Sequence, residues 1–155
     1  MIKKSLHPKL PLTADEILAK LEHFCAYRDR CSKEVKQKLK ELGASAADGA
    51  QILQVLEGDG FYDDARFAQA YAGGKFRINH WGKNRIRIEL RMRDIAPAHI
   101  DAALDAIEEA DYLQVLEQLV DKKKVLYEGD PQIREKIIGA LMRVGFEFDL
   151  IFRYL

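Results

Sequence analysis

An internal repeat of 51 residues is the feature that most constrains the fold of this 155-residue chain. Four apolar triplets align at this spacing in one ungapped register: Ile17 with Ala68 and Leu119, Val35 with Ile86 and Ile137, Leu39 with Leu90 and Leu141, and Leu53 with Leu104 and Leu155. Gly43 and Gly145 also align, at a place where a left-handed helix cap favours glycine, and Asp94 stands there in the second copy. We therefore predict three tandem copies of one unit.

Each copy carries signals for three helices. Thr13 and Glu16 have the spacing of a capping box before the first apolar run. Ser32 is predicted to cap the second helix of copy one, and Pro97 suits the first turn of the third helix of copy two. Asp130, followed by proline, predicts the start of the second helix of copy three.

These signals predict an all-α fold of three tandem three-helix repeats that form an elongated, curved array. We expect an N-terminal extension at 1–12 and repeats at 13–60, 61–110 and 111–155. Gly73 and Gly74 predict the end of the first helix of the second repeat. An apolar content of 48% is enough for the chain to bury a core.

One segment of the second repeat conflicts with this interpretation. Residues 85–93 alternate between charged and apolar side chains, a pattern that by itself is typical of a β-strand. We still predict a helix, because the equivalent segments of the other repeats have helical periodicity. On a helix, Ile86 and Leu90 would lie on one side and Ile88 and Met92 nearly opposite, which suits a helix that packs inside its own unit and against a neighbour or partner.

Charge is sorted along the chain although the formal net charge is zero. Between residues 75 and 93 there is one acid, Glu89, and seven basic residues: Lys75, Arg77, Lys83, Arg85, Arg87, Arg91 and Arg93. Residues 94–121 contain eight acids and no Lys or Arg. Such sorting could orient the protein on a charged partner. The alternative is two solvated faces that neutralise each other.

The sequence offers little for catalysis. Gly82 and Lys83 do not form a phosphate-binding loop, because the required upstream glycine is missing and Asn84 follows. His23, Cys25 and Cys31 could be imagined as metal ligands, but a fourth ligand at zinc-like spacing is missing, so core or surface roles are favoured. Asp63 and Asp64 resemble a magnesium pair only superficially and are better explained as residues that start a helix. We expect no enzyme activity, no cofactor and no metal site.

The cellular setting follows from what the sequence lacks. It has no apolar run of membrane-spanning length, and its first residues lack the apolar stretch of a secretory signal. We therefore expect a cytoplasmic protein that does not bind membranes. We also expect it to be a monomer. Cys25 and Cys31 are expected to be ordinary thiols in that reducing compartment.

Three segments resemble the RecX family. Residues 60–71 (GFYDDARFAQAY) and 81–90 (WGKNRIRIEL) look like the family signature, and 26–35 (AYRDRCSKEV) is similar to its first repeat. The likeness covers roughly residues 20–110, and a weaker third repeat extends it to the end. Asp94 departs from the family pattern, which usually has glycine at this position.

The resemblance implies a regulator that binds the RecA recombinase filament and mostly inhibits its ATPase and strand-exchange activities, in homologous recombination, DNA repair and the SOS response. Family members are thought to lie in the filament groove, with single-stranded or double-stranded DNA as a further contact. The seven basic residues are the expected partner-binding site, and Lys83, Arg87 and Arg91 would follow one another along one helix face. A stand-alone DNA-binding helical module is the main alternative, and a scaffold for protein assembly is a third.

Overall fold

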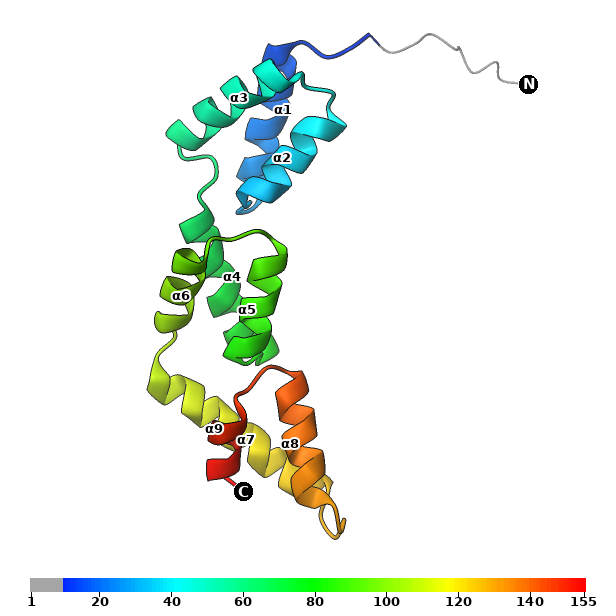
Figure 1. Cartoon of the computed structure of the whole chain (residues 1–155), viewed down its shortest axis with the longest axis vertical. Helices are drawn as coiled ribbons and strands as arrows, with labels where there is room; N and C mark the ends of the chain where they lie inside the picture. The colour runs from blue at the N-terminus through cyan, green and yellow to red at the C-terminus, as the bar shows by residue number, and fades with distance from the viewer. Residues whose placement is uncertain (1–9) are drawn as a thin grey trace, which may run out of the picture. The chain divides into compact units, whose positions relative to one another are not determined.

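The computed structural model describes residues 10–155, which form nine α-helices and no strand (Figure 1). The first nine residues of the predicted N-terminal extension lie outside this range. The described chain divides into two compact units, unit 1 ending at Asp63 and unit 2 beginning at Asp64. Unit 1 contains α1 (Ala14–Tyr27), α2 (Ser32–Glu41) and α3 (Ala46–Gly58). Unit 2 contains α4 (Asp64–Asn79), α5 (Lys83–Met92), α6 (Pro97–Asp105), α7 (Glu109–Leu126), α8 (Ile133–Arg143) and α9 (Phe148–Arg153).

The helices pack as triplets, and this confirms the predicted fold class. Within each triplet, α1–α3, α4–α6 and α7–α9, every helix contacts the other two. The exact boundaries expected between repeats stay a prediction. The core of unit 1 is made of side chains from all three of its helices and the segment after them: Ile17, Leu21, Cys25, Val35, Leu39, Ile52, Leu56 and Tyr62.

The start of α1 follows the capping box. The backbone N–H of Glu16 donates to the Thr13 hydroxyl at 3.2 Å. The cap expected at Ser32 is wrong by one residue, because Cys31 has extended backbone and is itself the N-cap, so that Ser32 already belongs to α2. Ser45, which the sequence patterns did not single out, caps α3 by accepting from the N–H of Asp48 at 3.1 Å.

The 51-residue register holds best in the middle helix of each triplet. Six equivalent positions there are at most 5% exposed: Val35, Ile86 and Ile137, and Leu39, Leu90 and Leu141. The first helix of the third triplet departs from the register. Leu119 is only half-buried, while the buried Leu116 and Val120 lie 48 residues after the buried Ala68 and Ala72.

The segment with alternating charge is helical, as the repeat predicts. Ile86 and Leu90 of α5 are fully buried, whereas Ile88 and Met92 on the other side are 56% and 63% exposed. A strand would have placed all four on one face, so burial of only two of them favours the helix. Asp94 closes α5 in the left-handed conformation, with φ of +56°, and needs no glycine to do so.

The end of α4 expected at Gly73 and Gly74 is wrong. The helix runs through both glycines to Asn79 and leaves the helical conformation at His80, which has φ of +55°. Ala72 and Phe76, on either side of the glycine pair, are buried where α4 packs on α5 and α6. This burial outweighs the helix propensity lost at two glycines, about 1 kcal/mol each.

Candidate partner-binding surface

The seven predicted basic residues all lie in the α4–α6 triplet of unit 2, but they do not form one uniform face. Lys75 and Arg77 are on α4, and the others are on α5 or, for Arg93, at its C-terminal cap. Their side chains divide into three groups by what they contact. One group packs on the rings of Tyr71 and Trp81, one has partners on α6 or α7, and one is exposed.

The first group surrounds Tyr71 and Trp81, and we call these five side chains the aromatic cluster. Lys75 Nζ lies 4.8 Å from the centre of the Trp81 ring, and the Arg85 guanidinium lies 3.9 Å from it. The Arg93 guanidinium lies 4.7 Å from the centre of the Tyr71 ring. The two rings meet edge to face at 6.5 Å. Cation–π contacts of this kind contribute about 0.5–1 kcal/mol each when exposed, so they restrain the three cations without neutralising them.

Partial burial within the aromatic cluster favours the neutral form of Tyr71. Burial raises the pKa of the Tyr71 hydroxyl, and the nearby Arg93 acts in the opposite direction without cancelling the effect. Arg93 also pairs with Glu89, the one acid of this segment, at 3.1 Å. The cluster therefore presents a net positive charge, carried mainly by Lys75 and Arg85.

The second group contains Lys83 and Arg87, which have partners inside unit 2. Arg87 Nη1 lies 2.7 Å from the Asp101 carboxylate on α6, and Lys83 Nζ lies 4.9 Å from the centre of the Tyr112 ring on α7. The third residue of the predicted helix face, Arg91, is exposed and has no ion pair within residues 10–155. Among the seven basic residues, Arg77 on α4 is the other exposed one.

The N-terminus of α5 is held by the α7–α9 triplet. The N–H of Gly82 donates to the Val144 carbonyl at 2.8 Å, and the N–H of Asn84 donates to the Gly145 carbonyl at 3.0 Å. A Cβ atom at Gly82 would lie 2.2 Å from the carbonyl carbon of Gly145, so this approach of two backbones requires glycine. These contacts fix the position of the helix that carries most of the basic residues.

Tyr112 of α7 also connects the N-terminus of α5 to the third triplet. Its hydroxyl accepts from the Lys83 N–H at 3.0 Å and donates to the Glu147 carboxylate at 2.7 Å. Its buried ring packs against two phenylalanines. Its ring centre lies 5.7 Å from that of Phe76 and 5.2 Å from that of Phe146. Burial raises the pKa of Tyr112 far above its usual value, so the hydroxyl stays neutral.

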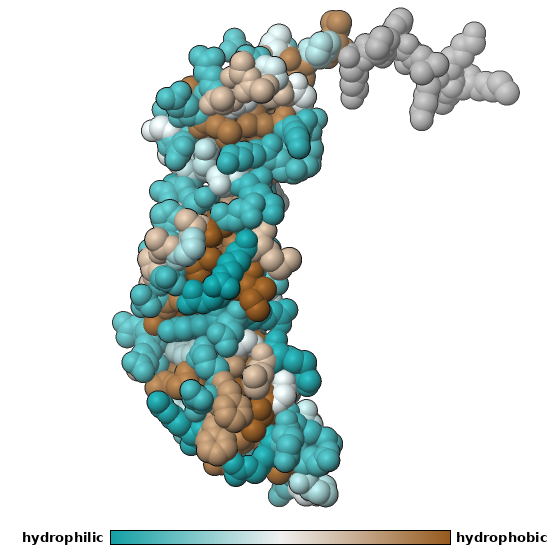
Figure 2. Space-filling view, in the orientation of Figure 1, coloured by the Kyte–Doolittle hydropathy of each residue, from teal (hydrophilic) through white to brown (hydrophobic). Residues whose placement is uncertain are grey.

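Apolar side chains are exposed on the same two helices. Ile78 is 79% exposed, and Ile88 and Met92 are more than half exposed. Figure 2 shows hydrophobic side chains interleaved with strongly hydrophilic ones on the face of unit 2 that it displays. A surface that combines cations with exposed apolar side chains has the composition of a protein-binding patch.

Sequence reasoning found the basic residues but missed their aromatic partners. Tyr71 and Trp81 both lie in the segments that carry the family resemblance, so the signal was present as two aromatic residues flanking Lys75. Tyr112 gave no such signal, because it is 29 residues from Lys83 and 35 from Glu147 in the sequence.

Other chemistry is sparse in the described part of the chain. Residues 10–155 contain no group of three or more His, Cys, Asp or Glu side chains placed to hold a metal ion. Cys25 and Cys31 are both buried. In the same range, no helix has both the length and the apolar character needed to cross a membrane.

Comparison with known proteins gives a consistent family. Residues 63–104 match the second three-helix domain of RecX, and residues 109–155 match the third. The regulatory protein RecX of Bacillus licheniformis is 30% identical over 132 residues, which cover 83% of this chain and 49% of the relative. RecX of Leuconostoc mesenteroides is 26% identical over 151 residues, covering 88% of this chain and 57% of the relative. The chain thus spans about half the length of these relatives.

Solved structures show the same fold. A crystal structure of RecX from Lactobacillus salivarius matches with a TM-score of 0.84 and 20% identity, covering 91% of this chain and 93% of that one. A second crystal structure of a regulatory protein RecX matches with a TM-score of 0.79 and 22% identity, covering 96% of this chain and 80% of that one. With two of its three helix triplets matched to RecX domains, the chain belongs to the RecX family.

Proposed function

We propose that this protein binds the RecA recombinase filament and modulates it, mostly by inhibiting its ATPase and strand-exchange activities. The observation that carries the proposal is the concentration of the seven basic residues on α4, α5 and the cap of α5, which we call the α4–α5 surface. All seven lie inside the segment that matches the second RecX domain. The relatives are named regulatory proteins, which fits a role in binding and not in catalysis. The protein would act as a monomer in the cytoplasm, where the recombinase works.

The geometry of this surface suits a charged, structured partner. Lys75 and Arg85 are restrained on the Trp81 ring, so less side-chain freedom is lost when they bind. Arginine can form paired hydrogen bonds with carboxylates or phosphates, either of which a nucleoprotein filament offers. The exposed Ile88 and Met92 add apolar contacts that a purely electrostatic DNA-binding surface does not need.

The test reverses the two exposed cations, Arg77→Glu with Arg91→Glu, and measures inhibition of RecA ATP hydrolysis on single-stranded DNA. Neither residue packs in the core, so the fold should be retained. We expect the concentration for half-inhibition to rise roughly tenfold, as about 1.4 kcal/mol of binding energy is lost over two contacts. Reversing Lys83 and Arg87 is less informative, because a glutamate at position 87 would face Asp101 and also disturb unit 2.

The matched control is Lys122→Glu with Lys124→Glu, which makes the same change of charge at two exposed positions of α7. It should inhibit like the parent protein. If both double variants lose inhibition equally, net charge and not the α4–α5 surface is responsible. If neither loses it, the partner-binding site is elsewhere.

A stand-alone DNA-binding module is the second candidate, favoured by the basic character of α5. It predicts binding to single-stranded DNA without recombinase, with affinity that falls as salt rises. Losing two phosphate contacts would reduce the log–log salt slope by about 1.4 in the Arg77 and Arg91 double variant. Binding to bare DNA as tight as binding to the filament would support this candidate over the recombinase.

A further inference from the structure

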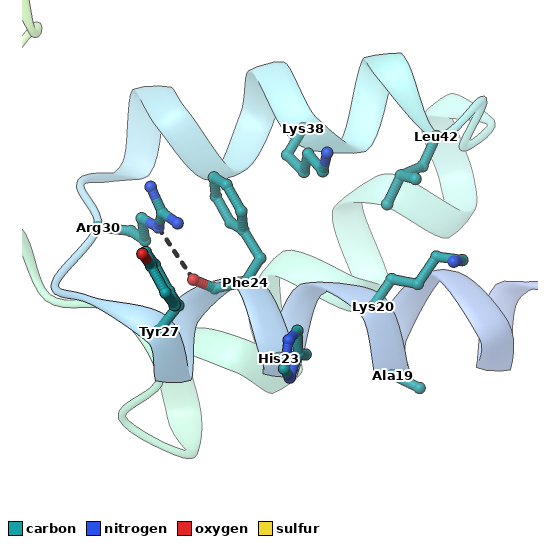
Figure 3. A pocket seen from close by; sticks show the side chains of 8 residues that line it. All are labelled: Ala19, Lys20, His23, Phe24, Tyr27, Arg30, Lys38 and Leu42. Atoms are coloured by element: carbon teal, nitrogen blue, oxygen red, sulfur yellow. Dashed lines mark hydrogen bonds between the residues drawn. The ribbon is translucent and has the colours of Figure 1, made fainter.

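Unit 1 contains a groove between α1 and α2 that the proposed function does not use (Figure 3). Its cavity has a volume of about 510 Å³. Six of its lining side chains matter here: the apolar or aromatic Phe24, Tyr27 and Leu42, and the basic Lys20, Arg30 and Lys38. The side chains that line it include no carboxylate. The groove therefore combines apolar walls with three basic side chains, of which Arg30 pairs at 3.6 Å with Glu34, a residue outside the lining.

Arg30 forms one end of the groove and is held firmly. Its guanidinium carbon lies 3.6 Å from the centre of the Phe24 ring, and its Nε–H donates to the Phe24 carbonyl at 2.9 Å (Figure 3). Only 9% of this residue is exposed. Because the guanidinium covers one face of Phe24, that face is not open for a nucleobase to stack on.

The two lysines are freer than Arg30. Lys38 Nζ lies 5.6 Å from the centre of the Phe24 ring, and its one ion pair, with Glu41 at 3.7 Å, is exposed. Exposed pairs of this kind contribute little, so Lys38 can exchange partners at low cost. Lys20 is exposed on α1.

At the equivalent positions of the middle repeat, two side chains contact each other. Tyr71 and Arg93 stand 51 residues after Lys20 and Leu42, and they stack on each other at 4.7 Å. In unit 1, a lysine and a leucine stand at these positions and line the cavity. The first and middle repeats thus differ at this pair of positions.

We propose that this groove binds an acidic peptide segment of a partner protein that carries one bulky apolar side chain. The apolar side chain would enter the cavity against Phe24 and Leu42, and flanking carboxylates would pair with Lys20 and Lys38. Single-stranded nucleic acid fits less well, since it needs successive open aromatic rings, whereas Arg30 covers one face of Phe24 and also lies 6.0 Å from the centre of the Tyr27 ring. The inference concerns a different surface from α4–α5 and does not depend on the recombinase proposal.

The experiment follows amide resonances of the full ¹⁵N-labelled chain during titration with the blocked peptide Asp-Glu-Ser-Phe-Asp-Glu. We expect shifts confined to α1, α2 and the turn between them, and a Kd on the order of 0.1–1 mM. A peptide with Ser in place of Phe should bind at least tenfold more weakly. Shifts that are absent, or that lie mainly in unit 2, would overturn the proposal.

A second experiment reverses the charge of the two groove lysines. Lys20→Glu with Lys38→Glu should weaken peptide binding at least tenfold. Lys36→Glu with Lys40→Glu, which changes the charge equally at exposed positions of α2 outside the groove, should leave it unchanged. Circular dichroism checks that both variants remain helical. Equal losses in the two variants would show non-specific attraction and contradict a built site.

Two other occupants are outcomes of the same test. If an oligothymidylate shifts the groove resonances at lower concentration than the peptide, the ligand is nucleic acid and the proposal is wrong. If sedimentation shows that the chain alone dimerises, and Lys20→Glu with Lys38→Glu abolishes the dimer, the groove binds a second copy and the proposal is again wrong. A monomer whose groove responds to the peptide supports it.

Discussion

At the scale of single residues, Leu39, Leu90 and Leu141 occupy equivalent positions in the three triplets. They are 5%, 0% and 2% exposed. Each packs between helices of its own triplet, so truncation leaves a cavity that the surrounding side chains can fill only in part. Their equivalence was predictable from spacing alone, because a buried leucine in a repeated unit returns at the period of the repeat.

We predict that Leu90→Ala lowers the free energy of unfolding of unit 2 by about 2–5 kcal/mol. Ile88→Ala, on the exposed side of the same helix, should change it by less than about 0.5 kcal/mol. Urea denaturation followed by circular dichroism measures both. Equal effects of the two variants would mean that α5 does not face the core as described.

Tyr112 gives a prediction about pH. Its pKa is raised in the folded protein above the value of 10.0 that the residue has in an unfolded chain. The neutral form therefore stabilises the fold fully below pH 10, and this contribution is lost as the pH rises above it. Tyr112→Phe should remove two hydrogen bonds, costing about 1–3 kcal/mol at pH 7, and should flatten the fall of stability between pH 10 and 11.5. An unchanged alkaline slope in the variant would refute the assignment.

At the scale of elements, two glycines of unit 2 differ in whether the structure has room for a side chain at their position. Gly74 is inside α4, and a Cβ atom there would meet nothing within 4 Å. Gly82, at the start of α5, lies against the backbone of Gly145. Sequence patterns could not separate these cases, because a glycine that ends a helix, one that interrupts it and one that lets two backbones approach look alike without their neighbours.

We predict that Gly74→Ala raises the stability of unit 2 by about 0.4–1 kcal/mol, since alanine suits a helix interior. Gly82→Ala should lower it by about 1–3 kcal/mol or more, and should speed hydrogen exchange at the amides of Gly82 and Asn84, which donate to the third triplet. Thermal denaturation and exchange measured by NMR test the pair. If Gly74→Ala were destabilised, position 74 would not be inside a helix, and α4 would end near the glycine pair as the sequence predicted.

The elements also show where periodicity misleads. The alternation in 85–93 indicates a strand if it is considered alone, and only the repeat, which carries information from the other two copies, favours α5. In α7, the first helix of the third triplet, the 51-residue register predicts the wrong core residue. Leu116 and Val120 are buried there, and Leu119 is not. A shift of three residues is close to one helical turn, so it preserves the apolar face while changing which residues are buried.

At the scale of the whole molecule, the fold class and the family followed from the sequence, while the organisation of the candidate surface did not. The run of cations between residues 75 and 93 was visible, but helix geometry distributes neighbouring residues over different faces. Lys83 and Arg87 therefore have internal partners, Lys75, Arg85 and Arg93 pack on aromatic rings, and Arg77 and Arg91 are exposed. Such a division depends on contacts across helices that no local pattern contains.

Co-sedimentation with preformed RecA filaments on single-stranded DNA tests whether the α4–α5 surface binds the recombinase filament. We predict that the parent protein and the Lys122→Glu, Lys124→Glu variant sediment with the filaments, and that the Arg77→Glu, Arg91→Glu variant stays mostly in the supernatant. A folded Arg77→Glu, Arg91→Glu variant that sediments as completely as the parent at every concentration, or a parent protein that never sediments with RecA, would contradict it.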